Sequence, residues 1–284
     1  MVASNTKKEL MNEFVLQKYR DLGGILTDSF QYIRVHWKSL GKALLLLVLP
    51  FYLISGLLVG DSYSNFLTAV MENPNADPGT LFTGNFLFGL LLLAFSSGAL
   101  LTASLTHVQI ARDHGEVQLS QITDRFGGNF LKLFLIYVLI ILAIFFSAFL
   151  FIIPAIYIGV KLFLAPATSI LEDLNPIDAI TRSWSLTTGH WWFTFAVYLV
   201  MNIISSFMSY ILIIPMGIVI SFVGMAGADA ESSLMSMMGI FYGLMIVFAS
   251  LFSVIMLIAM CLHYFNLIER KEGTGLRQQI EELG

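Results

Sequence analysis

The sequence has few charged residues and almost no cysteine. Of its 284 residues only 12% are Asp, Glu, Lys or Arg, about half the share that soluble domains carry. One cysteine, Cys261, excludes a disulfide framework within the chain. The net charge of −4 gives no sign of a nucleic-acid partner, and none is expected. These shortages argue against both an ordinary soluble domain and a disulfide-stabilised secreted one.

Motifs for catalysis and cofactor binding are missing as well. The sequence contains no GxGxxG, no Walker pattern and no GxSxG. His107 and His114 stand seven residues apart near Asp113 and Glu116, but this spacing matches no recognised metal-ligand pattern. We expect these histidines to be solvated loop residues. The sequence therefore predicts no enzyme, no catalytic or metal-binding residue and no cofactor.

Long apolar runs are what the sequence has in abundance, since 57% of its residues are hydrophobic. A helix needs about 20 mostly apolar residues to span a bilayer. In chain order the predicted spans are 43–60, 86–105, 133–153, 155–171, 191–214 and 239–267. The uncharged stretch 215–228 is interpreted as a kinked extension of the fifth helix or an interfacial piece, because a seventh span would break the charge pattern described next. The predicted fold is an all-α polytopic membrane protein with six transmembrane helices.

Basic residues indicate the orientation of these spans. With six spans, every Lys and Arg except Lys161 falls on the side of the N-terminus. The opposite loops hold only acidic charges, which are Asp61, Glu72, Asp77, Asp229 and Glu231. We therefore predict a cytoplasmic segment 1–20, a transmembrane domain 21–268 and a cytoplasmic tail 269–284. If one run were not a span, the termini would lie on opposite sides and the charge asymmetry would be lost.

A short polar pattern recurs before each pair of spans. The copies are LTDSF at 26–30, ITDRF at 122–126 and ITRSW at 180–184. In the third copy Asn175, Pro176 and Gly189 are typical of the start and end of a helix. Chance similarity is the alternative, because any interfacial helix needs apolar spacing and flanking aromatics.

From this recurrence we predict three hairpins of two spans, each preceded by a cytoplasmic-side amphipathic interfacial helix. Their apolar faces include Leu26, Phe30, Ile33 and Trp37 in the first copy, Leu119, Ile122 and Phe126 in the second, and Ile177, Ile180 and Trp184 in the third. The predicted aromatics at the headgroup level are Trp37, Trp184, Trp191 and Trp192.

Two stretches of the chain resemble a known family. YIGVKLFLAPATSILEDLNPIDAITRSWSLTTGHWW at 157–192 and DLGGILTDSFQYIRVHWKSLGKALL at 21–45 are similar to the bacterial membrane-domain family named after glycerophosphoryl diester phosphodiesterase. The resemblance implies a six-helix membrane fold in the bacterial inner (plasma) membrane. The family's enzyme name comes from members fused to a catalytic barrel, and nothing in this chain resembles that barrel.

Lys161 is the most informative single residue, because a cation within a span costs about 2.5–3.5 kcal/mol on insertion scales. Its side chain is expected either to reach the external headgroups or to face the bundle, held by carbonyls freed at Pro166 or Pro215 or by a lipid phosphate. The polar residues nearby in sequence are Glu172, Asp178 and Arg182, and Asp178 and Arg182 are spaced as an i, i+4 ion pair. These four residues are the candidate lipid or structural polar site.

The sequence thus favours a membrane protein without catalytic activity that binds lipid, another membrane protein or a second copy of itself, as a scaffold or accessory subunit. A small transporter or channel subunit is the second hypothesis, although no chain of charged residues crosses the predicted spans. A membrane-embedded lipid-modifying enzyme is the third.

Overall fold

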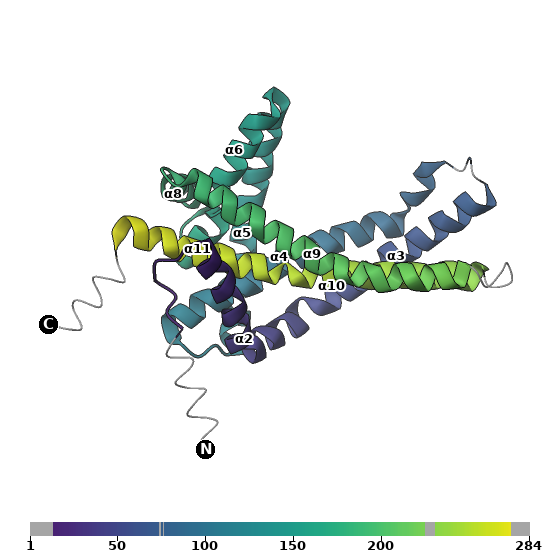
Figure 1. Cartoon of the computed structure of the whole chain (residues 1–284), viewed down its shortest axis with the longest axis horizontal. Helices are drawn as coiled ribbons and strands as arrows, with labels where there is room; N and C mark the ends of the chain where they lie inside the picture. The colour runs from purple at the N-terminus through teal and green to yellow at the C-terminus, as the bar shows by residue number, and fades with distance from the viewer. Residues whose placement is uncertain (1–13, 74, 76, 225–230, 274–284) are drawn as a thin grey trace, which may run out of the picture. The chain divides into compact units, whose positions relative to one another are not determined.

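The computed structural model of the chain describes residues 14–73, 75, 77–224 and 231–273, and all regular structure in these residues is helical (Figure 1). The helices are α2 (Leu22–Leu47), α3 (Leu49–Glu72), the 3-10 helix η1 (Pro78–Leu81), α4 (Gly84–His114), α5 (Leu119–Leu150), α6 (Ile152–Leu162), α7 (Ala165–Leu171), α8 (Pro176–Thr187), α9 (Trp191–Gly224), α10 (Glu231–Phe252) and α11 (Val254–Glu272). Four charged residues on which the predicted orientation depends lie outside the described residues: Lys7, Lys8, Asp229 and Arg277.

Five helical stretches are long and apolar enough to cross a membrane. They are Gly84–His114, Leu119–Phe149, Ile152–Leu171, Trp191–Ile211 and Met235–Glu272. A sixth span results if Leu22–Leu47 and Leu49–Val70, which are bent by 50° at their junction, count as one. The chain is therefore an all-helical, multi-span membrane protein with five or six candidate spans in its described part.

Two predicted spans are broken near a proline. The run 43–60 is divided between α2 and α3 at Val48, and Pro50 lies in the first turn of α3. The run 155–171 is divided between α6 and α7, and Pro166 lies in the first turn of α7. Proline lacks an N–H and clashes with the carbonyl four residues earlier, so a helix ends before it. In the fifth span α9 instead continues through Pro215 to Gly224, which confirms the helical extension as far as this residue.

Only the third copy of the recurring pattern forms a short helix of its own, which is α8. Asn175 caps its first turn by accepting hydrogen bonds from the backbone N–H groups of Ile177 (3.1 Å) and Asp178 (3.0 Å). Gly189 follows its end with a φ of +83°, as the sequence predicted. The second copy is instead the beginning of the long helix α5, and the first lies within α2. An amphipathic interfacial helix before every hairpin is therefore not confirmed by the helix boundaries and stays a prediction.

The predicted apolar faces of α2 and α8 carry exposed side chains, while their inward faces combine apolar residues with polar ones. Trp37 of α2 is 60% exposed and Ile177 of α8 is 70% exposed. The buried residues are Ile25, Asp28, Ser29, Tyr32, His36, Leu40 and Ala43 in α2, and Ala179, Ser183, Leu186 and Thr187 in α8. This arrangement suits a surrounding of lipid, because polar groups in hydrocarbon must find partners within the protein.

The described chain packs as two compact units, each built from separate stretches of sequence. Unit 1 takes its described residues from 1–43, 101–203 and 254–284, and unit 2 takes them from 44–100 and 204–253. In unit 1, α5 and α6 lie side by side as a hairpin (Figure 1). Unit 1 holds every candidate site residue that the sequence indicated.

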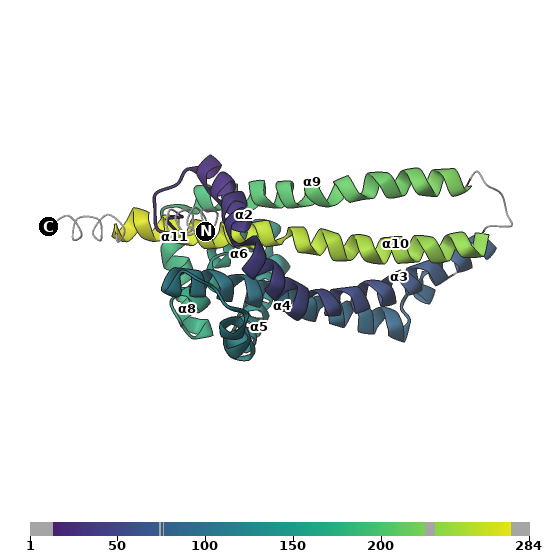
Figure 2. The same ribbon diagram turned by 90° about the horizontal axis from the view of Figure 1, so that it is seen from below.

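Unit 2 contains a close contact between α3 and α10, which lie side by side (Figure 2). Gly56 and Gly60 of α3 face Gly243 and Gly239 of α10. A Cβ added to Gly60 would lie 2.1 Å from the carbonyl oxygen of Gly239, and one added to Gly243 would lie 2.0 Å from that of Gly56. Both helices thus carry a GxxxG pattern, which lets helix backbones approach closely in membranes.

Hydroxyl groups join α3 to the first half of α4 in the same unit. Ser55 Oγ donates to the carbonyl of Gly89 (2.8 Å), and Tyr52 and Ser97 form a hydrogen bond between their hydroxyls (3.1 Å). Such bonds satisfy side-chain polar groups inside a membrane protein at a modest gain in stability.

Candidate functional site

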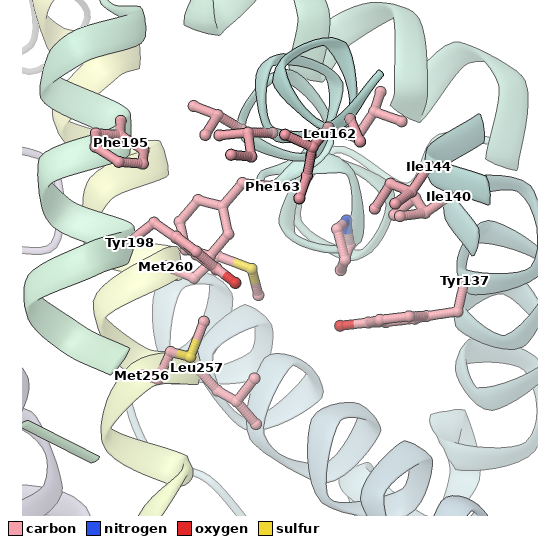
Figure 3. Close-up of a pocket in the computed structure, with 16 residues that line it drawn as sticks. Tyr137, Ile140, Ile144, Leu162, Phe163, Phe195, Tyr198, Met256, Leu257 and Met260 are labelled. Carbon is pink, nitrogen blue, oxygen red and sulfur yellow. The ribbon is translucent and has the colours of Figure 1, made fainter. Parts of the chain in front are cut away.

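A cavity of about 470 Å³ lies in unit 1, between α5, α6, α9 and α11 (Figure 3). Its lining residues are Tyr137, Ile140, Ile144, Ile152, Ala155, Ile156, Gly159, Val160, Leu162, Phe163, Pro166, Phe195, Tyr198, Met256, Leu257 and Met260. None of these side chains is charged. All of them belong to candidate spans, so the cavity lies within the membrane-spanning part of the chain. Its size and lining are typical of sites for apolar ligands.

Small residues on α6 leave room for this cavity. Ala155 and Gly159 lie one turn apart and face the isoleucines of α5. A Cβ added to Gly159 would meet only Ile144 Cδ1, at 3.8 Å, which is an ordinary contact. A larger side chain at this position would therefore extend into the cavity without striking backbone.

Two tyrosines bring the polar atoms of side chains into the cavity. Figure 3 shows the hydroxyl ends of Tyr137 from α5 and Tyr198 from α9 pointing toward its centre. The ring of Tyr198 packs edge-on against Phe163, with ring centroids 5.4 Å apart. The sequence did not single out these tyrosines, because neither belongs to a motif and the contact joins residues distant in the chain.

Lys161 lies on the other side of α6 from the cavity and ties this helix to α8. Its ammonium donates to Thr188 Oγ1 (2.8 Å) and lies over the rings of Trp184 and Tyr157, 5.2 and 5.7 Å from their centroids. Its backbone carbonyl accepts from Ser183 Oγ (2.7 Å). The ammonium thus has partners within the protein and does not need an external lipid headgroup to bind it.

The Lys161 ammonium is nevertheless only one side-chain layer below the protein surface. Lys161 is 3% exposed, whereas the covering residues Tyr157 and Trp184 are 44% and 43% exposed. Trp191 stacks on Tyr157 and donates from Nε1 to its backbone carbonyl (3.2 Å). Two aromatic rings, those of Tyr157 and Trp184, thus contact the cation and stabilise it through the negative charge of their faces, and Trp191 supports Tyr157 from outside.

Glu172 and Arg182 meet in a second polar cluster, where the end of α7 lies against α8 and α11. Arg182 Nε donates to both carboxylate oxygens of Glu172 (2.9 and 3.0 Å), and Arg182 Nη2 donates to Glu272 Oε1 (2.7 Å). The hydroxyl of Tyr264 donates to Glu172 (2.9 Å). Burial alone would lower the pKa of Arg182, but the bonds from Glu172 and Glu272 outweigh it and raise this pKa. The guanidinium stays charged and fastens α8 to α11.

Asp178 does not join this cluster. Its carboxylate accepts from the side-chain amide of Asn175, within the N-terminal cap of α8. The expected ion pair with Arg182 is replaced by the pairs with Glu172 and Glu272. The four predicted polar residues therefore divide into the Lys161 contact, the Arg182 cluster and a helix cap.

The predicted interfacial aromatics are unevenly exposed. Trp192 is 76% exposed and packs edge-on against Trp191, with centroids 4.7 Å apart. Trp37, 60% exposed, has the Lys38 ammonium 5.5 Å from its ring centroid.

His107 is buried rather than solvated, which corrects the prediction made from the sequence. It is 0% exposed, and its ring forms hydrogen bonds with Tyr32 (2.8 Å, at Nδ1) and Ser39 (2.9 Å, at Nε2). The ring of His36 lies 5.2 Å from that of His107. The residue is part of the long helix α4, whereas the sequence placed it in or near a loop. Among the described residues, no group of three or more His, Cys, Asp or Glu side chains has a metal-binding arrangement.

The described start of the chain is fastened to α11 by Arg20, a residue that belongs to no motif in the sequence. Arg20 Nε donates to Asp28 (2.7 Å), and its backbone N–H donates to Asn266 Oδ1 (2.8 Å). Burial lowers the pKa of Arg20, although the nearby Asp28 carboxylate opposes this shift. Arg270 completes the contact by donating to the carbonyl of Arg20 (3.0 Å).

No family model, curated protein or solved structure matches the chain. The resemblance of 157–192 and 21–45 to a membrane-domain family therefore stays a prediction.

Proposed function

We propose that this multi-span membrane protein binds a membrane lipid, whose apolar part fills the cavity between α5, α6, α9 and α11. The observation that carries the proposal is the cavity itself, about 470 Å³ in volume and lined without any charged side chain. Lipids are the apolar molecules that surround a membrane-spanning helix. In this proposal the protein performs no chemistry and acts as a scaffold or accessory subunit that holds the lipid for a membrane partner or for a second copy of itself.

Native mass spectrometry of protein extracted in mild detergent tests this proposal. Gly159→Leu should fill part of the cavity and lower the amount of co-purified lipid. Gly127→Leu is the matched control, because Gly127 lies in α5 with nothing within 4 Å of an added Cβ. Equal lipid retention in the two variants and the wild type would contradict the proposal. The same spectra read out any second copy or other subunit.

We further propose that both termini face the cytoplasm, in the inner membrane of a bacterium. The support is the distribution of basic residues together with the six spans obtained when the bent pair α2–α3 counts as one. A cysteine at Asn75 should react with an impermeant reagent in intact cells, and one at Ser120 only after permeabilisation; both residues are exposed. Reaction at Ser120 in intact cells would refute the orientation.

The three-hairpin arrangement with interfacial segments belongs to the same proposal. Its support is the outward apolar face of α8, where Ile177 and Trp184 are exposed and Ala179 and Ser183 are buried. Fluorescence quenching of the tryptophans by brominated lipid tests whether this face meets the membrane, with Trp184→Phe measured to isolate its signal. Loss of the quenched component in that variant is expected, and an unquenched Trp184 would contradict the placement.

A lipid-hydrolysing enzyme is a second candidate, favoured by one observation. Ser39 Oγ lies 2.9 Å from His107 Nε2, and His107 Nδ1 lies 2.8 Å from the hydroxyl of Tyr32. A hydroxyl beside an imidazole that a third group orients is the arrangement of an activated nucleophile. Ser39 also lines a surface pocket of about 170 Å³ together with Lys38 and Glu116.

A fluorophosphonate probe distinguishes this candidate from a purely structural contact. Covalent labelling of the wild-type protein that is lost in Ser39→Ala would support the enzyme. If neither the wild type nor Ser39→Ala is labelled, Ser39 has only a structural role, which is to join α2 to α4.

A further inference from the structure

The hydroxyls of Tyr137 and Tyr198 have no hydrogen bond with any described residue, although both point into the cavity (Figure 3). The two residues are 40% and 39% exposed, and they lie on different helices. Phe163 fixes the ring of Tyr198 by its edge-on contact. The two phenols are thus held at the wall of one apolar space with their polar ends free.

Free phenol hydroxyls are costly in this position. Moving a hydroxyl from water into an apolar medium without a hydrogen-bond partner is unfavourable, and the surrounding hydrocarbon offers no partner. Tyrosine is suited to such a place only when its hydroxyl finds a partner. The occupant of the cavity therefore has to offer a hydrogen-bonding atom.

We propose that the cavity binds a neutral lipid through a carbonyl oxygen, which accepts hydrogen bonds from both Tyr137 and Tyr198. This inference rests on the proposed function and names the chemical class of its ligand. A carbonyl oxygen has two lone pairs and no proton to donate, so it matches two phenol donors. The hydrocarbon chain of the same lipid lies against the isoleucines of α5 and the methionines of α11 that line the cavity.

The absence of a charged lining residue disfavours the anionic oxygen groups of lipids. A carboxylate or phosphate would need a cation, and none lines the cavity. Lys161 is the nearest basic residue along α6, but its ammonium binds Thr188 and the rings of Tyr157 and Trp184, away from the cavity. A free fatty acid or a charged headgroup is therefore disfavoured in this space, while a neutral ester or ketone oxygen fits it.

Two sources supply this chemistry in a membrane, which are the ester carbonyl of a glycerolipid and the ring carbonyl of an isoprenoid quinone. The experiment measures binding of three fluorescent-tailed probes to full-length protein in detergent: a diacylglycerol, its dialkyl ether analogue without carbonyls, and an isoprenoid benzoquinone. The wild type should bind at least one carbonyl probe roughly 10-fold more tightly than the ether analogue, from two hydrogen bonds. Whichever carbonyl probe shows this preference identifies the source.

The variant Tyr137→Phe/Tyr198→Phe keeps the shape of the cavity and removes both donors. It should bind the carbonyl probe and the ether analogue with equal affinity, whereas the control Tyr210→Phe should keep the wild-type preference. Tyr210 lies on the same helix as Tyr198 and is 62% exposed, but it does not line the cavity.

The outcomes separate this inference from the proposed function. If the wild type binds all probes equally, or if the double variant keeps the preference, the carbonyl contact is wrong while lipid binding stands. If no probe binds and Gly159→Leu retains as much native lipid as the wild type, the lipid cavity itself is wrong and the inference falls with it.

Discussion

Replacing Gly60 by alanine tests the packing of unit 2 through a single methyl group. The added Cβ would lie 2.1 Å from the carbonyl oxygen of Gly239, which is about 1.4 Å less than a normal separation of about 3.5 Å. The obstacle is backbone, so no side chain can rotate away and the helices themselves have to separate. Overpacking of this kind costs about 1–3 kcal/mol, and separation also weakens the neighbouring contact between Gly56 and Gly243.

The gain in helix propensity opposes this cost, since alanine is better than glycine by about 1 kcal/mol within a helix. We therefore expect Gly60→Ala to lower the free energy of unfolding, by up to about 2 kcal/mol. Gly41→Ala is the control, because Gly41 lies within α2 and has nothing within 4 Å of an added Cβ. It should leave the stability unchanged or raise it by up to about 1 kcal/mol.

Unfolding by sodium dodecyl sulfate in mixed micelles, followed by circular dichroism, measures both variants. The double variant Gly60→Ala/Gly239→Ala should be less destabilised than the sum of its single changes, because the first methyl already separates the helices. If Gly60→Ala were as stable as Gly41→Ala, the close approach of α3 and α10 would be refuted.

Three further pairs of variants test unit 1, two in the same unfolding assay and one by membrane insertion. Lys161→Met should alter the free energy of unfolding by less than about 1 kcal/mol, because losing the contacts of the ammonium is offset by removing a buried charge. Lys161→Glu should lower it by about 3 kcal/mol or more, because it places an anion against ring faces. Equal effects of the two changes would contradict the cation–π contacts. Glu172→Gln should lower the free energy of unfolding by about 1–3 kcal/mol, because Glu172 accepts hydrogen bonds from both Arg182 and Tyr264. Glu272→Gln should lower it less, since Arg182 still pairs with Glu172 in that variant. The reverse order would refute this cluster. Ile177→Asp should reduce membrane insertion more than Ser185→Asp, and similar insertion of the two would show that the outward face of α8 does not meet lipid.

Local features of the fold could be predicted from the sequence. Asn175, Pro176 and Gly189 define α8 because a helix cap depends on residues only a few positions apart. The candidate spans follow from apolar runs, since the bilayer sets their length. The breaks at Val48 and before Pro166 carry a local signal too, because each lies just before a proline that the sequence shows.

Contacts between distant segments could not be predicted in this way. Arg182 has a carboxylate four residues earlier, yet it pairs with Glu172 and Glu272, which only the packing of α8 against α7 and α11 brings near. His107 has charged neighbours in the sequence, yet it is buried because α4 continues past it and its partners come from α2. The cavity likewise depends on four helices whose association no local pattern records.

The glycine contact of unit 2 is an intermediate case. Gly56 and Gly60 form one GxxxG pattern and Gly239 and Gly243 form another, and both lie in apolar runs where such patterns mark helix interfaces. The patterns indicate that each helix packs closely against some other helix. That they face one another is a long-range fact, which the structure supplies.

Photo-crosslinking with a bifunctional lipid tests the central claim, lipid binding in the cavity, most directly. A diacylglycerol with a diazirine within its acyl chain is incorporated into membranes that contain the protein, irradiated, and the adducts are mapped by mass spectrometry. Binding in the cavity predicts adducts concentrated on Ile144, Met256 and Met260, and their loss in Gly159→Leu but not in Gly127→Leu. Adducts spread over outward residues such as Phe145 and Phe149, which are 64% and 86% exposed, with no enrichment in the cavity, would contradict it.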